Sequence, residues 1–277
     1  MRSKFKAVKF LLILVMSGTG LASAFASSQP VKFVNPPRAN QTTVIAKVVN
    51  FNPPPPPNGP APGGRERGGA KRGDSSLICP KTNPDFTALA YNSQEKQDIK
   101  DVTNVWGYTT SANPSLLFYV PFSQQPSYST EFILKEDSAD SDEIIYETTI
   151  PLPEKAGVIS WTLPGDAPEL KVGQRYRWFF SIYCDPEKMS PPVHVEGVIY
   201  RMPVNSEVAG KLATATLHEK LAIYAENGFW YDAIATLAEL RQQNPQNPFL
   251  RENWQSLLSS VNLEDVAKKP ILGSTKN

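Results

Sequence analysis

Histidine and cysteine are scarce in this chain, with two residues of each among 277. Catalytic and metal sites usually bring several such side chains together, often with carboxylates. The sequence also contains no serine nucleophile motif, no phosphate-binding glycine loop ahead of a helix and no C-x-x-C pair. We therefore expect a protein that is not an enzyme and that carries no metal or cofactor.

Net charge and long apolar runs are scarce as well. The formal net charge is +1 at pH 7, so the composition does not indicate a nucleic-acid partner. Beyond the first residues, no run approaches the roughly 20 apolar residues that span a bilayer as a helix. The sequence thus predicts no transmembrane segment apart from the N-terminal signal.

The N-terminus has the features of a secretory signal peptide. Basic residues precede a short apolar run at 10–16, and Ala24-Phe25-Ala26 matches an A-x-A cleavage site. Cleavage after Ala26 is expected to deliver a secreted or periplasmic protein that begins at Ser27. An uncleaved membrane anchor is the alternative.

Residues 27–76 are rich in proline, glycine and basic side chains. The prolines at 53–57 predict a polyproline II spacer, and the stretch 63–73 reads GGRERGGAKRG. Such a segment has too few apolar side chains to offset the entropy lost on ordering. We interpret it as a disordered linker; weak attraction to an anionic envelope surface is the alternative.

From 77 to 204 the sequence consists of short β-branched and aromatic runs, with turn residues between them at roughly 8–12-residue spacing. This pattern is typical of an antiparallel β-sandwich of the immunoglobulin or fibronectin type III class. The runs lie at 116–120, 131–135, 143–150, 158–163, 176–184 and 193–201.

The most specific β-signal surrounds Tyr176. Leu170, a turn at Gly173 and a tyrosine that opens a strand match the tyrosine corner of these sandwiches. In that arrangement the ring packs under the crossover and the hydroxyl bonds to backbone upstream. We therefore predict a structural role for Tyr176.

Alternation along the last two strand runs leaves apolar side chains on both faces. With Tyr176 and its alternate neighbours in the core, the outer face still carries Phe179, Tyr183, Val198 and Tyr200. In a sheet with one solvated face, apolar and polar side chains alternate more regularly along each strand than they do here. We therefore expect something apolar to dock on these four residues.

A helical period begins near 205. The stretch 224–240, YAENGFWYDAIATLAEL, resembles the turn of a tetratricopeptide hairpin, with Tyr224 and Trp230 at the expected offsets. Asn247-Pro248 predicts the start of one further helix. One such unit cannot bury its apolar face alone. We expect residues 205–277 to pack on the sandwich, with Tyr224 and Trp230 as part of the interaction or docking face, and to end in a short disordered tail; a free peptide-binding repeat is the alternative.

Cys79 and Cys184 form an even pair. In an oxidising compartment such a pair indicates one disulfide that closes a long loop. Two separate free thiols are the alternative.

Several motifs occur together in this chain. They are Cys79-Pro80, Thr87-Ala88-Leu89, 107–122 (GYTTSANPSLLFYVPF), 173–186 (GQRYRWFFSIYCDP), Val195-Glu196-Gly197 and 224–240. In combination they resemble an uncharacterised, largely cyanobacterial family described as domain of unknown function 928, over roughly residues 77–266. Both cysteines fall at family positions, which supports the disulfide, while Ala90-Tyr91 departs from the expected Val-Pro. The family has no assigned activity, so the resemblance implies localisation and source but no mechanism.

Few residues suggest chemistry. His194 and Glu196 share one strand face and could act as a base with its partner or as two metal ligands, but a polar patch is the expectation. His218 with Glu219 is expected on a helix surface. An acidic group suits calcium by ligand type but matches no calcium loop, so we expect a solvated hairpin tip. Its members are Asp137, Asp140, Asp142 and Glu143.

These observations lead to three functional hypotheses. We expect an exported, non-catalytic binding or scaffold protein of the bacterial cell envelope, with an envelope or secreted protein as its partner. The first alternative is a carbohydrate-binding module that stacks sugars on surface aromatics, with Trp106, Tyr108 and Trp161 as candidates. The second alternative is a hydrolase with a site near His194 and Glu196.

Overall fold

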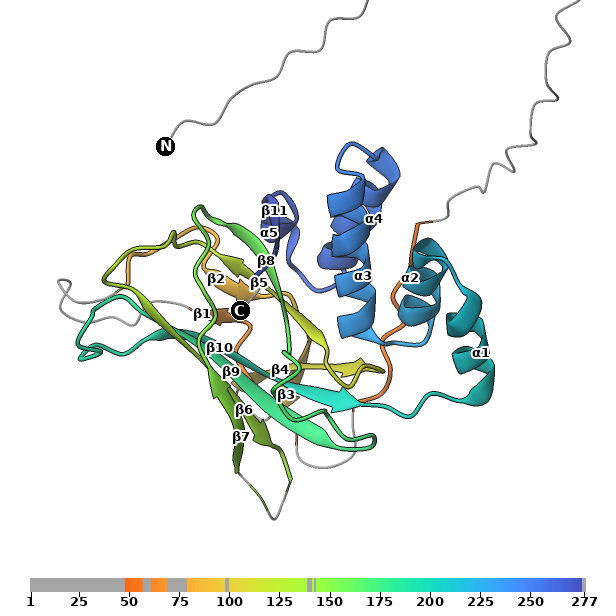
Figure 1. The fold of residues 1–277 in the computed structure, drawn as a ribbon, viewed down its shortest axis with the longest axis horizontal. Coiled ribbons are helices and arrows are strands. Elements are labelled where there is room, and N and C mark those ends of the chain that lie inside the picture. The colour runs from red at the N-terminus through yellow and green to blue at the C-terminus, as the bar shows by residue number, and fades with distance from the viewer. Residues whose placement is uncertain are drawn as a thin grey trace, which may run out of the picture. The chain divides into compact units, whose positions relative to one another are not determined.

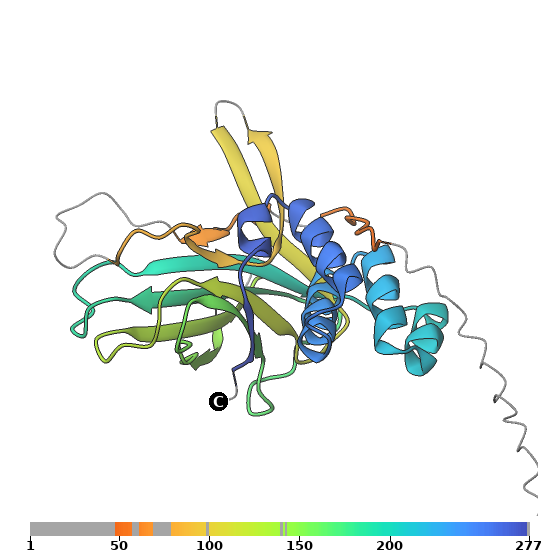
Figure 2. The same ribbon diagram turned by 90° about the horizontal axis from the view of Figure 1, so that it is seen from above.

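The computed structural model describes residues 48–56, 61–68, 79–97, 100–138, 141 and 143–275. The predicted signal peptide, its cleavage site and part of the predicted linker lie outside these residues. Within them, two mixed β-sheets enclose a common core, and helices cover one end (Figures 1 and 2). This part of the chain is mainly β, with its helices in the C-terminal third, as the sequence predicts.

The two sheets and the helices can be followed in Figure 1. Among the described residues, the six-stranded sheet has the order β3 (Tyr91–Gln97), β4 (Lys100–Thr109), β10 (Val193–Arg201), β9 (Arg175–Tyr183), β6 (Ser129–Glu136) and β7 (Ile144–Thr148). The five-stranded sheet has the order β1 (Arg67–Gly68), β2 (Phe86–Ala88), β5 (Ser115–Val120), β8 (Gly157–Thr162) and β11 (Ile271–Ser274). The helices are α1 (Ser206–Thr214), α2 (Leu217–Glu226), α3 (Trp230–Gln243), α4 (Pro248–Ser259) and α5 (Glu264–Ala267).

The prediction of fully antiparallel sheets is wrong at two pairings. β10 pairs with β4 in parallel, with Val198 opposite Trp106, and β11 pairs with β8 in parallel. Parallel neighbours require a long crossover connection. Strands β5 to β9 lie between β4 and β10 in the chain, and β9, β10 and the helices lie between β8 and β11. Side-chain alternation reports which face of a strand is buried and carries no information on the direction of its neighbour.

The core between the sheets follows from alternation. On β9 every second side chain is buried, and Trp178, Phe180 and Ile182 are 0 % exposed. Phe118 of the opposite sheet packs edge-on against Phe180, with ring centroids 4.8 Å apart. Each such ring contributes about 1.5–3 kcal/mol through burial alone.

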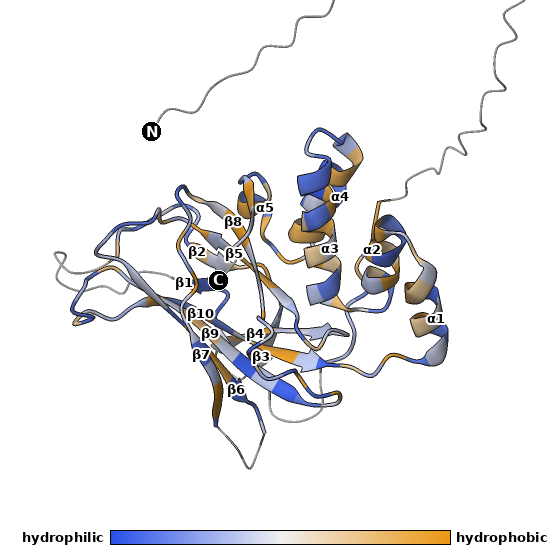
Figure 3. Ribbon diagram, in the orientation of Figure 1, coloured by the Kyte–Doolittle hydropathy of each residue, from blue (hydrophilic) through white to orange (hydrophobic). Residues whose placement is uncertain are grey.

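Local signals place the helix starts. The side chain of Asn247 accepts hydrogen bonds from the backbone N–H groups of Phe249 and Leu250, with Pro248 at the first helical position, as the sequence predicts. Thr216 and Glu219 form a capping box at the start of α2. Hydrophobic and hydrophilic residues share both α3 and α4 (Figure 3). No helix among the described residues has both the length and the apolarity that a membrane crossing needs.

Helix α3 enters the core of the sandwich instead of lying on its surface. It contacts β4 of one sheet and β5 and β11 of the other. Tyr231 is 2 % exposed, accepts a hydrogen bond from Trp178 Nε1 at 3.0 Å and donates one to the carbonyl of Val198 at 3.3 Å. The absent side chain of Gly107 makes room for it, because a Cβ there would approach the Tyr231 ring to 2.8 Å. The helix is thus held by both sheets.

The helices cover only part of the predicted docking face. Val198 and Tyr200 belong to an apolar cluster that includes Val208 of α1 and Tyr224 of α2. Phe179 and Tyr183 lie further along β9 and are covered by lysine side chains, Lys135 and Lys188. The docking prediction is therefore wrong for Phe179 and Tyr183, because a lysine stem and ammonium group provide the cover expected from helices.

The linker prediction is wrong for residues 61–68. The backbone of Gly63 accepts a hydrogen bond from Val105 of β4, and Arg65 exchanges two with Glu196 of β10. This segment therefore forms backbone hydrogen bonds to β4 and β10, next to the first residues that these two strands pair in parallel. It then pairs with β2 of the other sheet as β1. Backbone hydrogen bonds of this kind need no apolar side chains, so composition does not reveal them.

Residues 48–56 and the C-terminal tail also differ from prediction. The first segment contacts α2, α3 and α4 through hydrogen bonds and aromatic packing. Of the C-terminal tail, Ile271–Ser274 form β11 at the edge of the smaller sheet, and residues 276–277 lie outside the described residues. Both are held by partners far away in sequence, which a local reading of composition does not detect.

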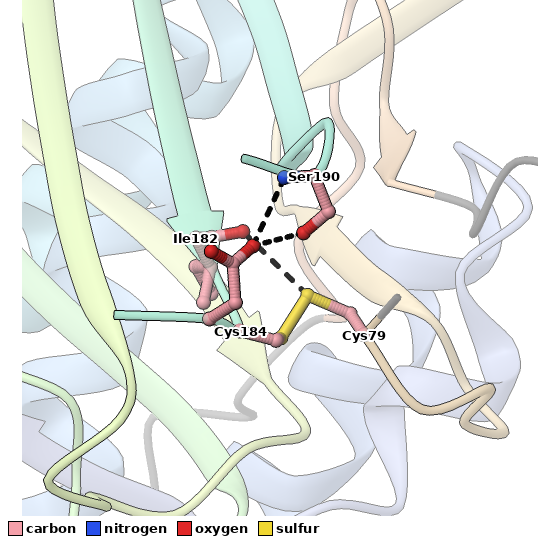
Figure 4. The surroundings of a disulfide bond; sticks show 5 residues. Cys79, Ile182, Cys184 and Ser190 are labelled. Atoms are coloured by element: carbon pink, nitrogen blue, oxygen red, sulfur yellow. Dashed lines mark hydrogen bonds between the residues drawn. A yellow bond between two sulfur atoms is a disulfide. The ribbon is translucent and has the colours of Figure 1, made fainter. Parts of the chain in front are cut away.

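A disulfide joins Cys79 to Cys184 across a separation of 105 residues (Figure 4). It links the segment before β2 to the end of β9. The turn that follows is held by Asp185, which accepts hydrogen bonds from the backbone of Met189 and Ser190. Ser190 appears beside the bond in Figure 4.

We predict that replacing Tyr176 with phenylalanine lowers the free energy of unfolding by roughly 1–3 kcal/mol. Tyr176 is buried, and its hydroxyl accepts a hydrogen bond from the backbone of Lys171 at 2.9 Å, the upstream contact that a tyrosine corner requires. Urea denaturation measures the change. The control is Tyr128→Phe, since no hydrogen bond of that hydroxyl occurs within the described residues. Equal stability of the two variants would refute the corner.

We predict that replacing both cysteines with alanine lowers the free energy of unfolding by about 4–5 kcal/mol, because the bond closes a loop on the order of 100 residues. Thermal unfolding with and without reductant gives the measurement. Reductant should lower the melting temperature of the wild type and leave the double variant unchanged. A wild type that melts equally in both conditions would contradict this account.

Candidate functional site: a polar cleft beside helix α3

An open cleft of about 310 Å³ lies where α3 meets the ends of β4, β5, β8 and β11. Its wall combines hydroxyl, carboxamide and carboxylate side chains with the apolar surfaces of one proline, two alanines and two tyrosine rings. The lining residues are Thr109, Ser111, Asn113, Pro114, Ser115, Ser160, Thr162, Tyr224, Tyr231, Asp232, Ala235, Thr236, Ala238, Glu239, Gln242 and Ser274.

Strand alternation and short turns bring these groups together. On β8, Ile159 and Trp161 enter the core, so Ser160 and Thr162 point to the other face. Between β4 and β5, the Thr109 hydroxyl accepts a hydrogen bond from the backbone of Ser111 at 3.1 Å, as Ser and Thr side chains often do in turns. The hydroxyl groups therefore come from elements far apart in sequence.

Asp232 connects α3 to this turn. Its carboxylate accepts hydrogen bonds from Thr110, one from the backbone N–H at 3.0 Å and one from the hydroxyl at 2.9 Å. Burial raises the pKa of Asp232 to about 6, although the hydrogen bonds from Thr110 act in the opposite direction. Near neutral pH, Asp232 is thus mainly ionised.

The cleft carries negative charge. Asp232 and Glu239 lie in its wall, and none of its lining residues is lysine, arginine or histidine. A phosphate or carboxylate group would be repelled there. Neutral hydroxyl-bearing groups and cations are the ligands that such a wall accepts, since it offers both donors and acceptors.

Of the predicted docking residues, only Tyr224 lines this cleft. Trp230 is buried in the core, where its indole donates to the carbonyl of Leu89 at 2.9 Å. The tyrosine-corner residue and the disulfide lie elsewhere in the sandwich. The sequence contains one signal for the cleft, the Thr-, Ser- and Asn-rich stretch 109–115, which our prediction treated as a motif of the family alone.

The residues proposed for sugar stacking are buried. Trp106 is 2 % exposed, Tyr108 7 % and Trp161 1 %. A sugar needs an accessible ring face, so these three aromatics do not serve as platforms. Trp106 and Tyr108 pack against residues of α1 and α2, and Trp161 packs between the sheets against Phe132, a burial that sequence alternation indicated only for Trp161.

Among the described residues, the pair His194 and Glu196 does not belong to a larger cluster of metal-ligating side chains. Within the described residues, no group of three or more His, Cys, Asp or Glu side chains is placed to hold a metal ion. Asp137 instead forms an ion pair with Arg175 at 2.7 Å. Asp140 and Asp142 lie outside the described residues, and Glu143 is exposed, as is His218 on α2.

A second pocket surrounds Glu66 and is held together by internal bonds. Asn92 Nδ2 donates to Glu66 and to the carbonyl of Val261. Arg67 donates to both carboxylate oxygens of Asp265 at 2.8 and 2.9 Å. Burial raises the pKa of Glu66 to about 7, against the opposing effect of Arg67. These groups bond one another, which indicates a role in fixing β1 to α5.

The fold and cleft define a β-rich protein with one internal disulfide and an acidic, hydroxyl-lined cleft. A model of the family described as Domain of Unknown Function (DUF928) matches residues 67–271, so the chain belongs to the DUF928 family. No curated protein matches the sequence. The match begins at β1 and ends at the first residue of β11, and it therefore includes all the helices and all the other strands described above.

We predict that Asp232→Asn removes a pH dependence of stability between about pH 4 and 6. Because the folded-state pKa is raised from 3.8 to about 6, the folded chain binds more protons than the unfolded chain in this window. The wild-type free energy of unfolding should fall, relative to the variant, by on the order of 2–3 kcal/mol as the pH rises through the window.

Urea denaturation at several pH values measures this difference. Glu252→Gln, at an exposed position on α4, is the matched control and should follow the wild type. Parallel curves for the wild type and Asp232→Asn would contradict a raised pKa.

Proposed function

We propose that this protein is an exported, non-catalytic binding protein of the bacterial cell envelope. The observation that carries the proposal is the acidic, hydroxyl-lined cleft beside α3. Its volume of about 310 Å³ is at the lower end of ligand pockets and suits one side chain or one sugar residue of a larger partner. The disulfide and the sequence features of a signal peptide support export.

A binding role is favoured over catalysis by what the carboxylates do. Both carboxylate oxygens of Asp232 accept hydrogen bonds from Thr110. Glu239 accepts a hydrogen bond at 3.0 Å from Gln243 of the same helix. A general acid or base needs an oxygen directed at the substrate. The remaining polar groups of the cleft are hydroxyls and carboxamides, and the lining contains no histidine or lysine that would activate a hydroxyl as a nucleophile.

The partner that fits the charge is an envelope or secreted protein that places a lysine or arginine side chain in the cleft. Two carboxylates and no basic residue line it, so a cation gains attraction on entry. A glycan is the second candidate, and the hydroxyl and carboxamide lining favours it, because sugars need paired donors and acceptors. We therefore propose the cleft as the glycan-binding site, in place of the aromatic residues, which are buried.

We also infer which known folds the sandwich and the helical hairpin resemble. An immunoglobulin- or fibronectin-type sandwich is supported by the hydrogen bond of Tyr176 to upstream backbone. A tetratricopeptide-like hairpin is supported by the turn at Gly228 between α2 and α3. In this proposal the hairpin is part of the sandwich core, and its helix α3 forms one wall of the binding cleft.

The test is a cross-linking pull-down from envelope extract with the mature chain, run beside a glycan array. We expect Glu239→Lys to abolish capture, since the change places a cation in the cleft. Glu252→Lys makes the same charge change on α4, away from the lining, and should bind like the wild type.

A protein partner lost only with Glu239→Lys supports the first candidate, and a glycan lost in the same way supports the second. Equal binding by the wild type and both variants would contradict a function for the cleft.

A further inference from the structure

Residues 48–56, which we call the strap, lie across the helical hairpin next to α2 (orange in Figures 1 and 2). The strap begins against α4, where Val49 donates its backbone N–H to Asn253 Oδ1 at 2.6 Å. It continues to the end of α2, where Asn52 donates to the carbonyl of Ala225 at 3.1 Å. It ends at β4, where the Tyr108 hydroxyl donates to the carbonyl of Pro55 at 2.9 Å.

The strap meets the protein with a period of three residues. Val48, Phe51 and Pro54 are half-buried, as is Val49 at the start of the strap, whereas Asn50, Asn52, Pro53, Pro55 and Pro56 are exposed. A polyproline II helix has three residues per turn, so positions i and i+3 lie on one face. Proline fixes φ near the value that this helix requires. From residue 50 to residue 56 the burial pattern is therefore that of an extended ligand that contacts a groove with every third side chain.

The groove is shaped for this ligand. The Phe51 ring packs edge-on against Trp230 with centroids 4.9 Å apart, and it lies 5.5 Å from Tyr91. Pro54 sits at the turn between α2 and α3, where a Cβ on Gly228 would come within 2.7 Å of its Cδ. Gly228 also has a φ of 75°, so glycine meets both requirements of the turn.

We infer that this groove is a recognition site for extended peptides with the pattern aromatic-x-x-proline, and that the chain fills it with its own residues 48–56. Aromatic-lined grooves that bind a preformed polyproline II segment are a known mode of peptide recognition. The partner is thus a proline-rich segment of another protein. It competes with a strap whose effective concentration is on the order of millimolar, because a short connection ties the strap to residue 61.

The test uses the full chain and a labelled synthetic peptide with the sequence of residues 46–58, AKVVNFNPPPPPN. In one variant, Phe51→Ala with Pro54→Ala weakens the strap at its anchors. In the matched control, Asn50→Ala with Pro53→Ala changes the residues one position earlier, which are exposed. Fluorescence anisotropy measures peptide binding, and circular dichroism verifies that each chain is folded.

We expect the anchor variant to bind the peptide at least about tenfold more tightly than the wild type or the matched control, because its groove is released. In the anchor-variant background, Tyr108→Phe should weaken the peptide about fivefold through loss of one hydrogen bond. Tyr128→Phe should have no effect. A peptide with Pro54→Ala should bind more weakly than one with Pro53→Ala.

A second measurement applies if the anchor variant does not fold. Residues 57–60 of the wild type are replaced by a protease recognition sequence and cut after folding, and exchange of the strap for labelled peptide is followed. Tyr108→Phe should speed the exchange and Tyr128→Phe should not.

Three outcomes would overturn the inference. The first is a folded anchor variant that does not bind the peptide. The second is equal effects of the Pro53 and Pro54 substitutions in the peptide. The third is concentration-dependent exchange of straps between copies, seen as a dimer by light scattering, since the partner would then be a second copy of this chain.

Discussion

The rest of the structure depends on the contacts of three consecutive residues at the start of α3. Trp230 donates to the carbonyl of Leu89 and packs against Phe51 of the strap. Tyr231 lies between the sheets and bonds to Trp178 and Val198. Asp232 fixes the turn at Thr110 that shapes the cleft. Cleft, core and strap therefore all depend on one turn of helix.

This arrangement explains how a single repeat-like hairpin persists without an array. In a solenoid the apolar face of each unit is buried by the next unit. Here both sheets bury the face of α3, and β4 lacks a side chain at Gly107, against which the Tyr231 ring packs. The strap covers part of the remaining surface of the hairpin. The hairpin is thus completed by a sandwich and a polyproline segment in place of neighbouring repeats.

Much of the fold could be predicted from local pattern. Six apolar runs coincide with β5 to β10, and cap signals locate the start of α4, because both depend on residues close in sequence. The contact of Tyr176 with upstream backbone spans only five residues. The parallel pairing of β4 with β10 and the placement of residues 61–68 depend on partners far away in the chain, which single-sequence patterns do not specify.

The candidate site was harder to predict for a related reason. Its hydroxyl groups come from four strands and two helices, and each alone resembles an ordinary solvated residue. The strap was misjudged because proline-rich composition usually signals a spacer, and the period of three in its contacts becomes visible only once the groove is known. Three aromatic residues were predicted to stack sugars at the surface, but aromatic side chains are more often buried than exposed.

The account claims above all that the start of α3 is part of the sandwich core. Native-state hydrogen exchange tests this most directly by comparing the amides of α3 with those of β9 and β10. The account predicts that all three elements open with the same free energy, because Tyr231 cannot leave Trp178 without opening the core. If α3 exchanged through an opening of clearly lower free energy while β9 stayed protected, the helix would be an independent cover and the account would be contradicted.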